Sequence, residues 1–109
     1  MFNSIGIATT GLDAADAWMT TTADNVANAS TPGYSSETPT LAADPALGGV
    51  TVTGISTSGG PVDLSIQIPN LVMATDVYAL NLAVVQRAAA MYQDITQLGS
   101  ETVMPAQAL

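Results

Sequence analysis

The C-terminal third of the chain predicts a helix that is apolar on two opposite faces, and no other feature constrains the fold as strongly. One row of residues, spaced by three and four, runs from Leu71 to Thr96, and a second runs from Met73 to Leu98. A helix turns about 100° per residue, so an offset of two residues puts the rows about 200° apart. One partner helix covers only one row. A chain of 109 residues offers no large core for the other, which we therefore expect to lie between subunits.

The partner helix is predicted at the other end of the chain. From Ile5 to Ala29, small or apolar residues recur at steps of three and four, which is the heptad pattern of a coiled-coil seam. Thr31-Pro32-Gly33 ends this helix, because proline lacks an N–H and biases the preceding residue toward extended geometry. We expect a mainly α fold, an antiparallel two-helix coiled-coil hairpin of residues ~4–29 and ~69–98 with a small β-hairpin and loop inserted.

The two rows assign residues to two kinds of contact. The residues predicted to pair the helices are Ile5, Leu12, Met19, Val26, Leu71, Tyr78, Leu82, Val85, Ala89 and Tyr92. The residues predicted to contact other subunits are Trp18, Met73, Val77, Leu80, Val84, Met91 and Leu98. Trp18 joins the second set because it lies off the main seam, and an exposed Trp on a helix flank is typical of interfaces.

The segment between the helices, residues 34–67, is rich in Ser, Thr, Pro and Gly. Residues 35–48 are predicted as loop and residues 49–57 as a strand. The apolar and polar alternation from Val62 to Ile68 predicts a second strand. Pro69 suits the first position of the following helix, and Gly99 the position after its end. The expected segments are therefore 1–33 (helix and turn), 34–67 (loop and hairpin), 68–99 (helix) and 100–109 (tail).

Charge and composition exclude several functional classes. The chain has nine acidic residues and one base, Arg87, for a net charge of −8, and it contains no His and no Cys. One Arg cannot neutralise the phosphates of a nucleic acid, and an anionic membrane surface would repel the chain. Without His or Cys there is no ordinary zinc site, no thiol nucleophile and no His-based triad. We expect no metal, no cofactor and no catalytic residues.

Two further predictions concern the role of neighbouring acidic residues and the absence of a membrane span. Asp13 and Asp16 share a helix face, where a solvated acidic surface explains them better than a weak metal site. The longest apolar stretch, Val77 to Val85, is interrupted by Asn81 and is shorter than the ~20 residues that a membrane span needs. We expect no membrane insertion, and the N-terminus shows no pattern of a cleaved signal peptide.

Two windows of the sequence together resemble one protein family. Gly11-Leu12-Asp13-Ala14-Ala15, followed by Met19 and by the stretch from Ala23 to Tyr34, resembles the N-terminal signature of bacterial flagellar rod and hook proteins. A second window, from Val62 to Met91, resembles the C-terminal helix of the same family. The matching motif residues are Gly11, Leu12, Ala15, Asn25, Asn28, Thr31, Pro32, Gly33, Tyr34 and Asn81. The length is closest to the small, proximal-rod type of subunit.

The resemblance implies a non-enzymatic structural subunit of the flagellar basal-body rod, assembling through its terminal helices into a tubular axial structure. It implies copies of the chain itself, other rod and hook-type proteins and the type III export apparatus as partners. It places the protein in the periplasm-spanning rod, exported without a cleaved signal. Pro69 stands where the family helix is already running, so we expect a later helix start here. The alternative is a soluble helical binding module or an export-related adaptor.

One expectation concerns Tyr34, the large side chain directly after the Thr31-Pro32-Gly33 turn. A helix stop alone explains Pro32 and Gly33 but does not explain an aromatic residue beyond them. We therefore expect Tyr34 to be largely buried, within the chain or against a neighbour, and to fix the direction in which the middle segment leaves the helices.

Overall fold

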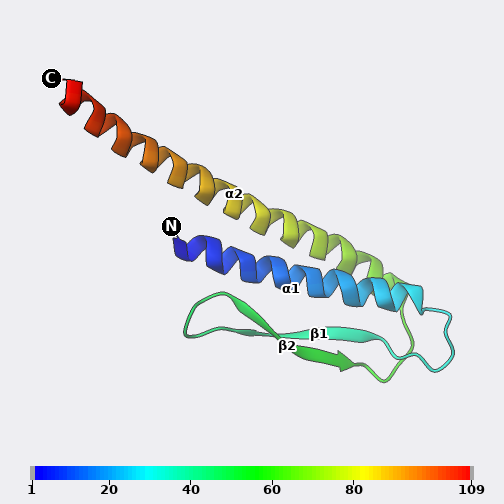
Figure 1. The fold of residues 1–109 in the computed structure, drawn as a ribbon. Helices are drawn as coiled ribbons and strands as arrows, with labels where there is room; N and C mark the ends of the chain where they lie inside the picture. The colour runs from blue at the N-terminus through cyan, green and yellow to red at the C-terminus, as the bar shows by residue number, and fades with distance from the viewer. Residues whose placement is uncertain (1, 109) are drawn as a thin grey trace.

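The computed structural model describes residues 2–108, and the side chains of residues 3–99. The elements in chain order are α1 (Phe2–Ala27), β1 (Glu37–Ala43), β2 (Val50–Thr57) and α2 (Leu64–Ala108). In Figure 1, α1 lies in the middle, with α2 along one side and the β1–β2 hairpin along the other. The molecule is 78 Å long and only 26 Å and 15 Å across. The predicted architecture, two antiparallel helices with a small hairpin between them in the chain, is confirmed.

The start of α2 differs from the prediction. The helix begins at Leu64, so the expected strand over residues 62–68 and the expected start at Pro69 are both wrong. Asp63 caps the helix: its Oδ1 accepts hydrogen bonds from the Ser65 hydroxyl (2.6 Å) and the Ser65 N–H (2.9 Å). These bonds lower the pKa of Asp63. The alternating pattern misleads because Leu64, Ile68 and Leu71 also repeat at helical spacing.

The end of α2 differs as well. The helix continues through Gly99 to Ala108, so Gly99 is not its terminus, and most of the expected tail is helical. A single Gly inside a helix costs about 1 kcal/mol relative to Ala. No proline follows within the next few residues to enforce a stop. α2 is therefore a 45-residue helix beside a 26-residue partner.

The hairpin exists, but its first strand comes from the segment predicted as loop. β1 pairs antiparallel with β2, from Glu37 opposite Thr57 to Ala43 opposite Val50, with a bulge after Thr40. Only β2 matches the predicted strand at residues 49–57. β1 was not predicted because proline, here Pro39, argues against a central strand. A two-stranded sheet has only edge strands, and proline is tolerated there. Asp44, for which no role was predicted, caps the connecting loop by accepting the Ala46 N–H at 2.9 Å.

The buried interior is made of small and polar side chains. Among the described residues, the buried hydrophobic ones are Ala8, Ala14, Ala15, Ala74 and Ala88. The largest side chains that are fully buried are those of Asn25 and Thr22. Large apolar side chains are mostly outside, and most of these exposed ones belong to α2. The chain therefore folds around a thin seam between backbones and leaves its main apolar surface uncovered.

The seam between the helices follows the predicted heptad only in part. On α1 it runs through the buried Ala8, Ala15 and Thr22, which lie on the predicted row. The residues between them differ: Gly11 and Asn25 face α2, while Leu12 and Met19 lie half-buried beside the seam and Val26 is exposed. Small residues let the two backbones approach closely, and this rotates the large side chains to the flanks.

The same displacement holds on α2. The buried residues there are Gln67, Ala74 and Ala88, with Asn81 half-buried between them. The predicted pairing residues lie beside this line. Val85 is half-buried, and the exposed ones are Leu71, Tyr78, Leu82, Ala89 and Tyr92. On α1, the predicted Ile5 is half-buried too. The antiparallel pairing is thus as expected, but the contact line is turned away from the larger side chains.

α2 is also apolar enough for a second environment. By length and composition alone, residues 64–99 could cross a membrane, with a mean hydropathy of 1.4 over an 18-residue window of which 6% is buried. The longest uninterrupted apolar run of the sequence is too short to reveal this high mean hydropathy. An exposed helix that packs against other subunits has the same composition, so the finding marks uncovered apolar surface in either case.

Candidate functional site

Asn25 is the centre of a buried hydrogen-bond network at the closed end of the helical hairpin. Its side chain is 1% exposed. The amide nitrogen Nδ2 donates to the Glu37 carbonyl (2.8 Å) and to Oε1 of Gln67 (2.9 Å). Its Oδ1 accepts from the Glu37 N–H (2.8 Å) and from the Tyr34 hydroxyl (3.0 Å). All the hydrogen-bonding capacity of the amide is used, and one side chain of α1 holds β1, α2 and the turn together.

Two further side chains extend this network, which we call the polar junction (Asn25, Tyr34, Ser36, the Glu37 backbone and Gln67). Gln67 Nε2 donates to the Ser36 hydroxyl at 3.3 Å, and both residues are buried. The Ser36 N–H donates to the Gly60 carbonyl at 3.0 Å, which ties in the segment before α2. Among the described residues, every buried side-chain nitrogen and oxygen has a partner. The junction is therefore fully satisfied and fixes the angle of the hairpin.

Tyr34 contributes its hydroxyl to the junction but is half-buried, so the expectation of a largely buried ring is met only in part. Desolvation raises the pKa of Tyr34, and the charges of Asp24 and Glu37 raise it further. All three effects favour the neutral phenol, which is the form that donates to Asn25.

The turn before Tyr34 is held by Asn28. Its Nδ2 donates to the Asp24 carbonyl at 2.9 Å, and its Oδ1 accepts the Thr31 hydroxyl at 3.1 Å. Pro32 is exposed, and Gly33 has a φ of 81°, a conformation that side chains other than glycine rarely adopt. The motif residues between Asn25 and Tyr34 thus form one device that stops α1 and delivers Tyr34 to the junction.

Gly11 lies where the Asn81 side chain of α2 packs directly on α1. A Cβ added at Gly11 would lie 2.6 Å from Cγ of Asn81. Asn81 donates through Nδ2 to the Val77 carbonyl in its own helix (2.9 Å), which holds the side chain against α1. The motif therefore needs glycine opposite this Asn, because any larger residue would push the helices apart.

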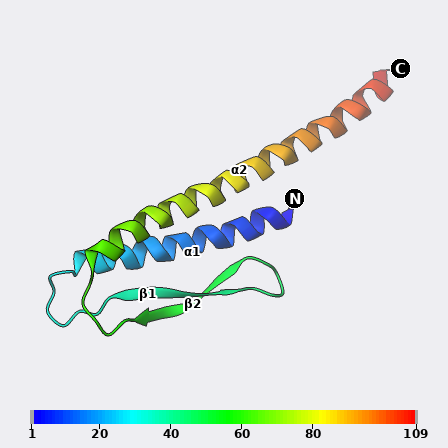
Figure 2. The same cartoon turned by 180° about the vertical axis from the view of Figure 1, so that it is seen from behind.

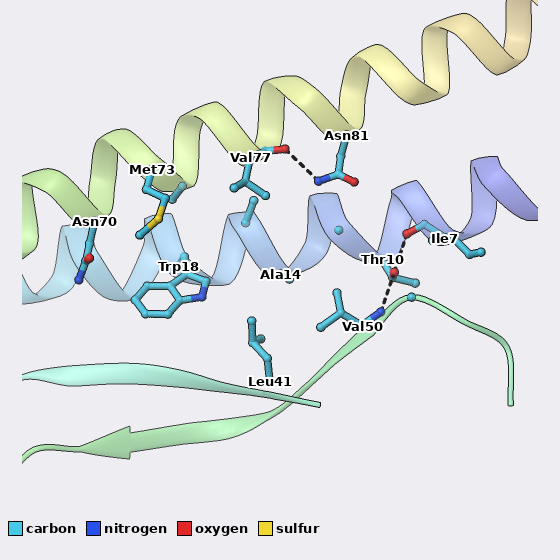
Figure 3. A pocket seen from close by; sticks show the side chains of 14 residues that line it. Ile7, Thr10, Ala14, Trp18, Leu41, Val50, Asn70, Met73, Val77 and Asn81 are labelled. Atoms are coloured by element: carbon cyan, nitrogen blue, oxygen red, sulfur yellow. Dashed lines mark hydrogen bonds between the residues drawn. The ribbon is translucent and has the colours of Figure 1, made fainter. Parts of the chain in front are cut away.

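An apolar groove of about 530 Å³ runs along α1 between α2 and the hairpin. Figure 3 shows Trp18 and Ala14 of α1 at its base, Met73 and Val77 on the α2 wall, and Leu41 and Val50 on the hairpin wall. Thr10 closes one end, where its hydroxyl accepts the Val50 N–H at 3.1 Å. None of the residues that line the groove is charged. The groove thus offers an apolar, uncharged recess on an acidic protein.

One exposed row of apolar residues runs from this groove to the far part of α2. We call it the α2 stripe, and it consists of Met73, Val77, Leu80, Val84, Met91, Ile95 and Leu98. Their side chains are 40% to 67% exposed. Six of the seven were predicted as subunit contacts, and Trp18, also predicted, lies in the groove beside Met73. Ile95 was not predicted from the sequence. Leu41 and Val50 were not predicted either, because their place in the groove depends on the hairpin register.

The acidic residues do not form a metal centre in the described part of the chain. No three carboxylates there lie close enough together to hold an ion. Asp13 and Asp16 are both exposed on α1. The candidate functional features are therefore the polar junction, the groove and the α2 stripe.

Comparison with known proteins identifies one segment. Residues 5–34 match a family described as "Flagella basal body rod protein". The matched segment is nearly all of α1 and the turn, including Gly11, Asn25, Asn28 and Tyr34. No curated protein matches the chain. The matched segment thus supplies the α1 and turn side of the helix crossing and of the polar junction, whose other side comes from residues outside the match.

Proposed function

We propose, on the premise that residues 5–34 match the flagella basal body rod protein family, that the chain is a structural subunit of the flagellar basal-body rod. The observation that carries the proposal is the α2 stripe. Seven large apolar side chains on one helix face remain in water in the single chain. The row is interrupted by Arg87 between Val84 and Met91, and exposed apolar surface of this extent marks a site of association with other proteins.

The physical drive for assembly is burial of the stripe. Burial of apolar surface contributes about 25 cal/mol per Å², and a typical stable contact buries about 800 Å² on each partner. The entropy lost on association offsets much of this, so affinity depends on how well the surfaces fit. When the contacting patches on two copies differ and the rotation between copies does not close into a ring, growth continues as a helical filament. A tubular rod is an assembly of this kind.

The charge of the chain sets how assembly responds to salt. With a net charge of −8 and one Arg, ion pairs between copies contribute little, and copies repel one another. Salt at physiological concentration screens charges more than about 8 Å apart. Association of the purified protein therefore increases as salt is raised from low concentration.

The proposed rod subunit also has partners and a route of export. The subunit joins copies of itself and other rod and hook-type proteins, and it reaches the basal body through the flagellar export apparatus. The thin interior supports this route, because a fold with only Ala, Thr and other small or polar side chains buried is easily unfolded for passage.

The direct test is electron microscopy of purified basal bodies that carry a tagged copy of the chain. We expect the tag in the rod and a loss of motility when the gene is deleted. A tag found only in the cytoplasm, bound one-to-one to another protein, would instead support the adaptor alternative and overturn the rod assignment.

A lipid bilayer is the competing environment for α2, because this helix is long and apolar enough to span one. In a span of residues 64–99, Asp76 and Arg87 would both lie within the apolar layer, as would the polar seam residue Asn81. Flotation with neutral lipid vesicles separates the two cases. We expect the protein to stay with the aqueous fraction, and co-flotation that resists alkaline extraction would contradict the rod proposal.

A further inference from the structure

The length difference between the helices makes part of α2 extend beyond the end of α1. Gly11 lies opposite Asn81, and Asn25 lies opposite Gln67. In this register the first residue of α1 lies opposite position ~90 of α2, so residues 91–108 extend beyond it by about 27 Å at ~1.5 Å per residue. Figures 1 and 2 both show this end of α2 running past the N-terminus, away from the rest of the molecule.

The projecting end carries the spacing of a groove-binding helix. Met91, Ile95 and Leu98 stand at positions i, i+4 and i+7, with side chains 57%, 54% and 60% exposed. Helices that dock in apolar grooves present anchors at this spacing. The same three residues are the last members of the α2 stripe, whose first members, Met73 and Val77, form one wall of the groove.

We propose that the groove of one copy receives the projecting end of α2 from a second copy, with Met91, Ile95 and Leu98 seated over Trp18. This inference rests on the proposed function, and it names the contact by which copies join. The groove lacks charge and the three anchors lack charge, and Asp94, which lies on the flank of the anchor row, stays in water at the rim of the groove. Trp and Met on the receiving side are typical of surfaces that accept helices.

The geometry excludes closure within one copy. α2 is one continuous helix, and its tip points away from the groove that its first half helps to form. Each copy therefore offers one groove and one tip at different places along its long axis. When successive copies are shifted along the long axis, one groove and one tip of each copy stay open and the contact continues as a head-to-tail row.

Two variants separate the groove from the tip. Leu41→Glu puts a charge on the hairpin wall, away from the α2 stripe, and Ile95→Glu puts a charge on the tip. Both positions are more than 40% exposed, so circular dichroism of each variant should match wild type. Gln93→Glu is the matched control, because it adds the same charge near the tip about 200° around the helix from Ile95.

Sedimentation velocity on the full chain then measures association. We expect wild type and Gln93→Glu to form a concentration-dependent series, and each Glu variant at Leu41 or Ile95 to associate at least ten-fold more weakly. A one-to-one mixture of the two variants should form a dimer and nothing larger, since only one intact groove and one intact tip remain compatible.

Trp18, the only tryptophan in the chain, reports which groove is filled. With Trp18→Phe added to the Leu41→Glu partner, the remaining Trp18 belongs to the copy that keeps an intact groove, and its emission should shift to shorter wavelength on mixing. As a readout free of added charge, a mixture of Leu41→Cys and Ile95→Cys chains should form an intermolecular disulfide, because the native chain has no Cys.

Each other outcome has a defined meaning. Wild-type-like association of Leu41→Glu, combined with no Trp18 shift, would overturn the groove contact while leaving assembly through the stripe intact. Absence of the mixed disulfide would overturn it in the same way. A wild-type chain that stays monomeric at every protein and salt concentration would overturn the proposed function itself, and with it this inference.

Discussion

The closed end and the projecting end of the molecule are built on opposite principles. At the closed end, Asn25 makes four hydrogen bonds within one buried network, and polar groups define the geometry. At the projecting end, α2 runs alone, and Met91, Ile95 and Leu98 face water. Directional bonds fix shape but contribute modest net free energy, whereas apolar burial is larger and non-directional. The difference teaches that this chain fixes its shape with buried polar groups and leaves most of its large apolar side chains exposed in the single chain.

The largest effect is expected from breaking the closed end. Asn25→Leu keeps the approximate shape but removes the partner of the Glu37 N–H, of the Glu37 carbonyl and of Gln67 Oε1. At ~1–3 kcal/mol for each buried group left unsatisfied, we expect a loss of about 3 kcal/mol or more in the free energy of unfolding. Urea denaturation measures it. Asn28→Ala is the control, because it removes exposed turn bonds and should lose only about 1 kcal/mol.

The next prediction tests whether the stripe serves assembly and not the fold. Val85 is half-buried near the seam, and its neighbour Val84 is 45% exposed on the stripe. Val85→Asp should lower the free energy of unfolding of the single chain by about 2 kcal/mol, since it brings a charge toward the helix contact. Val84→Asp should leave helix content unchanged and weaken sedimentation of oligomers. Equal loss of helix content in both variants would contradict the assignment of the two faces.

A smaller effect on the free energy of unfolding distinguishes Gly11, which packs on Asn81, from Gly6 near the start of α1. A methyl group at Gly11 would overlap the Asn81 amide, so Gly11→Ala should lose about 1–2 kcal/mol through overpacking. Gly6→Ala meets no atom within 4 Å and should gain about 0.5–1 kcal/mol from helix propensity. Thermal melting of both variants tests the pair. Two gains of the same size would show that the helices do not touch at Gly11.

The smallest expected effect is the pH dependence of the junction. The folded state raises the pKa of Tyr34 above its ordinary value of 10.0, chiefly through desolvation. The contribution of the neutral Tyr34 phenol to the free energy of unfolding is therefore fully present below pH 10. It is lost as the pH rises through the pKa of Tyr34 in the folded state. Urea midpoints between pH 9 and 11 should fall more steeply for wild type than for Tyr34→Phe. Parallel slopes for the two proteins would remove Tyr34 from the titration.

The sequence predicted what local periodicity controls. Both helices, their antiparallel order and the exposed α2 row follow from spacings of three and four, and Asn25 and Tyr34 were singled out by the family motif. The function of these motif residues could not be read from the sequence, because Asn25 meets Glu37 and Gln67, 12 and 42 positions away. The first strand was missed for a similar reason, since β1 is defined by its pairing with β2 and not by its own alternation.

The interior of this molecule, with Asn25 and Thr22 as its largest fully buried side chains, has a consequence for its lifetime. A ligand that binds only the folded state stabilises it by about 2.7 kcal/mol when present at a hundred times its dissociation constant, and a neighbouring subunit acts in the same way. On the proposed function, a chain outside the rod opens often enough for proteases to cut it, and a chain inside does not. Unincorporated copies are therefore cleared while incorporated copies persist, so degradation itself helps to keep the subunit where it is assembled.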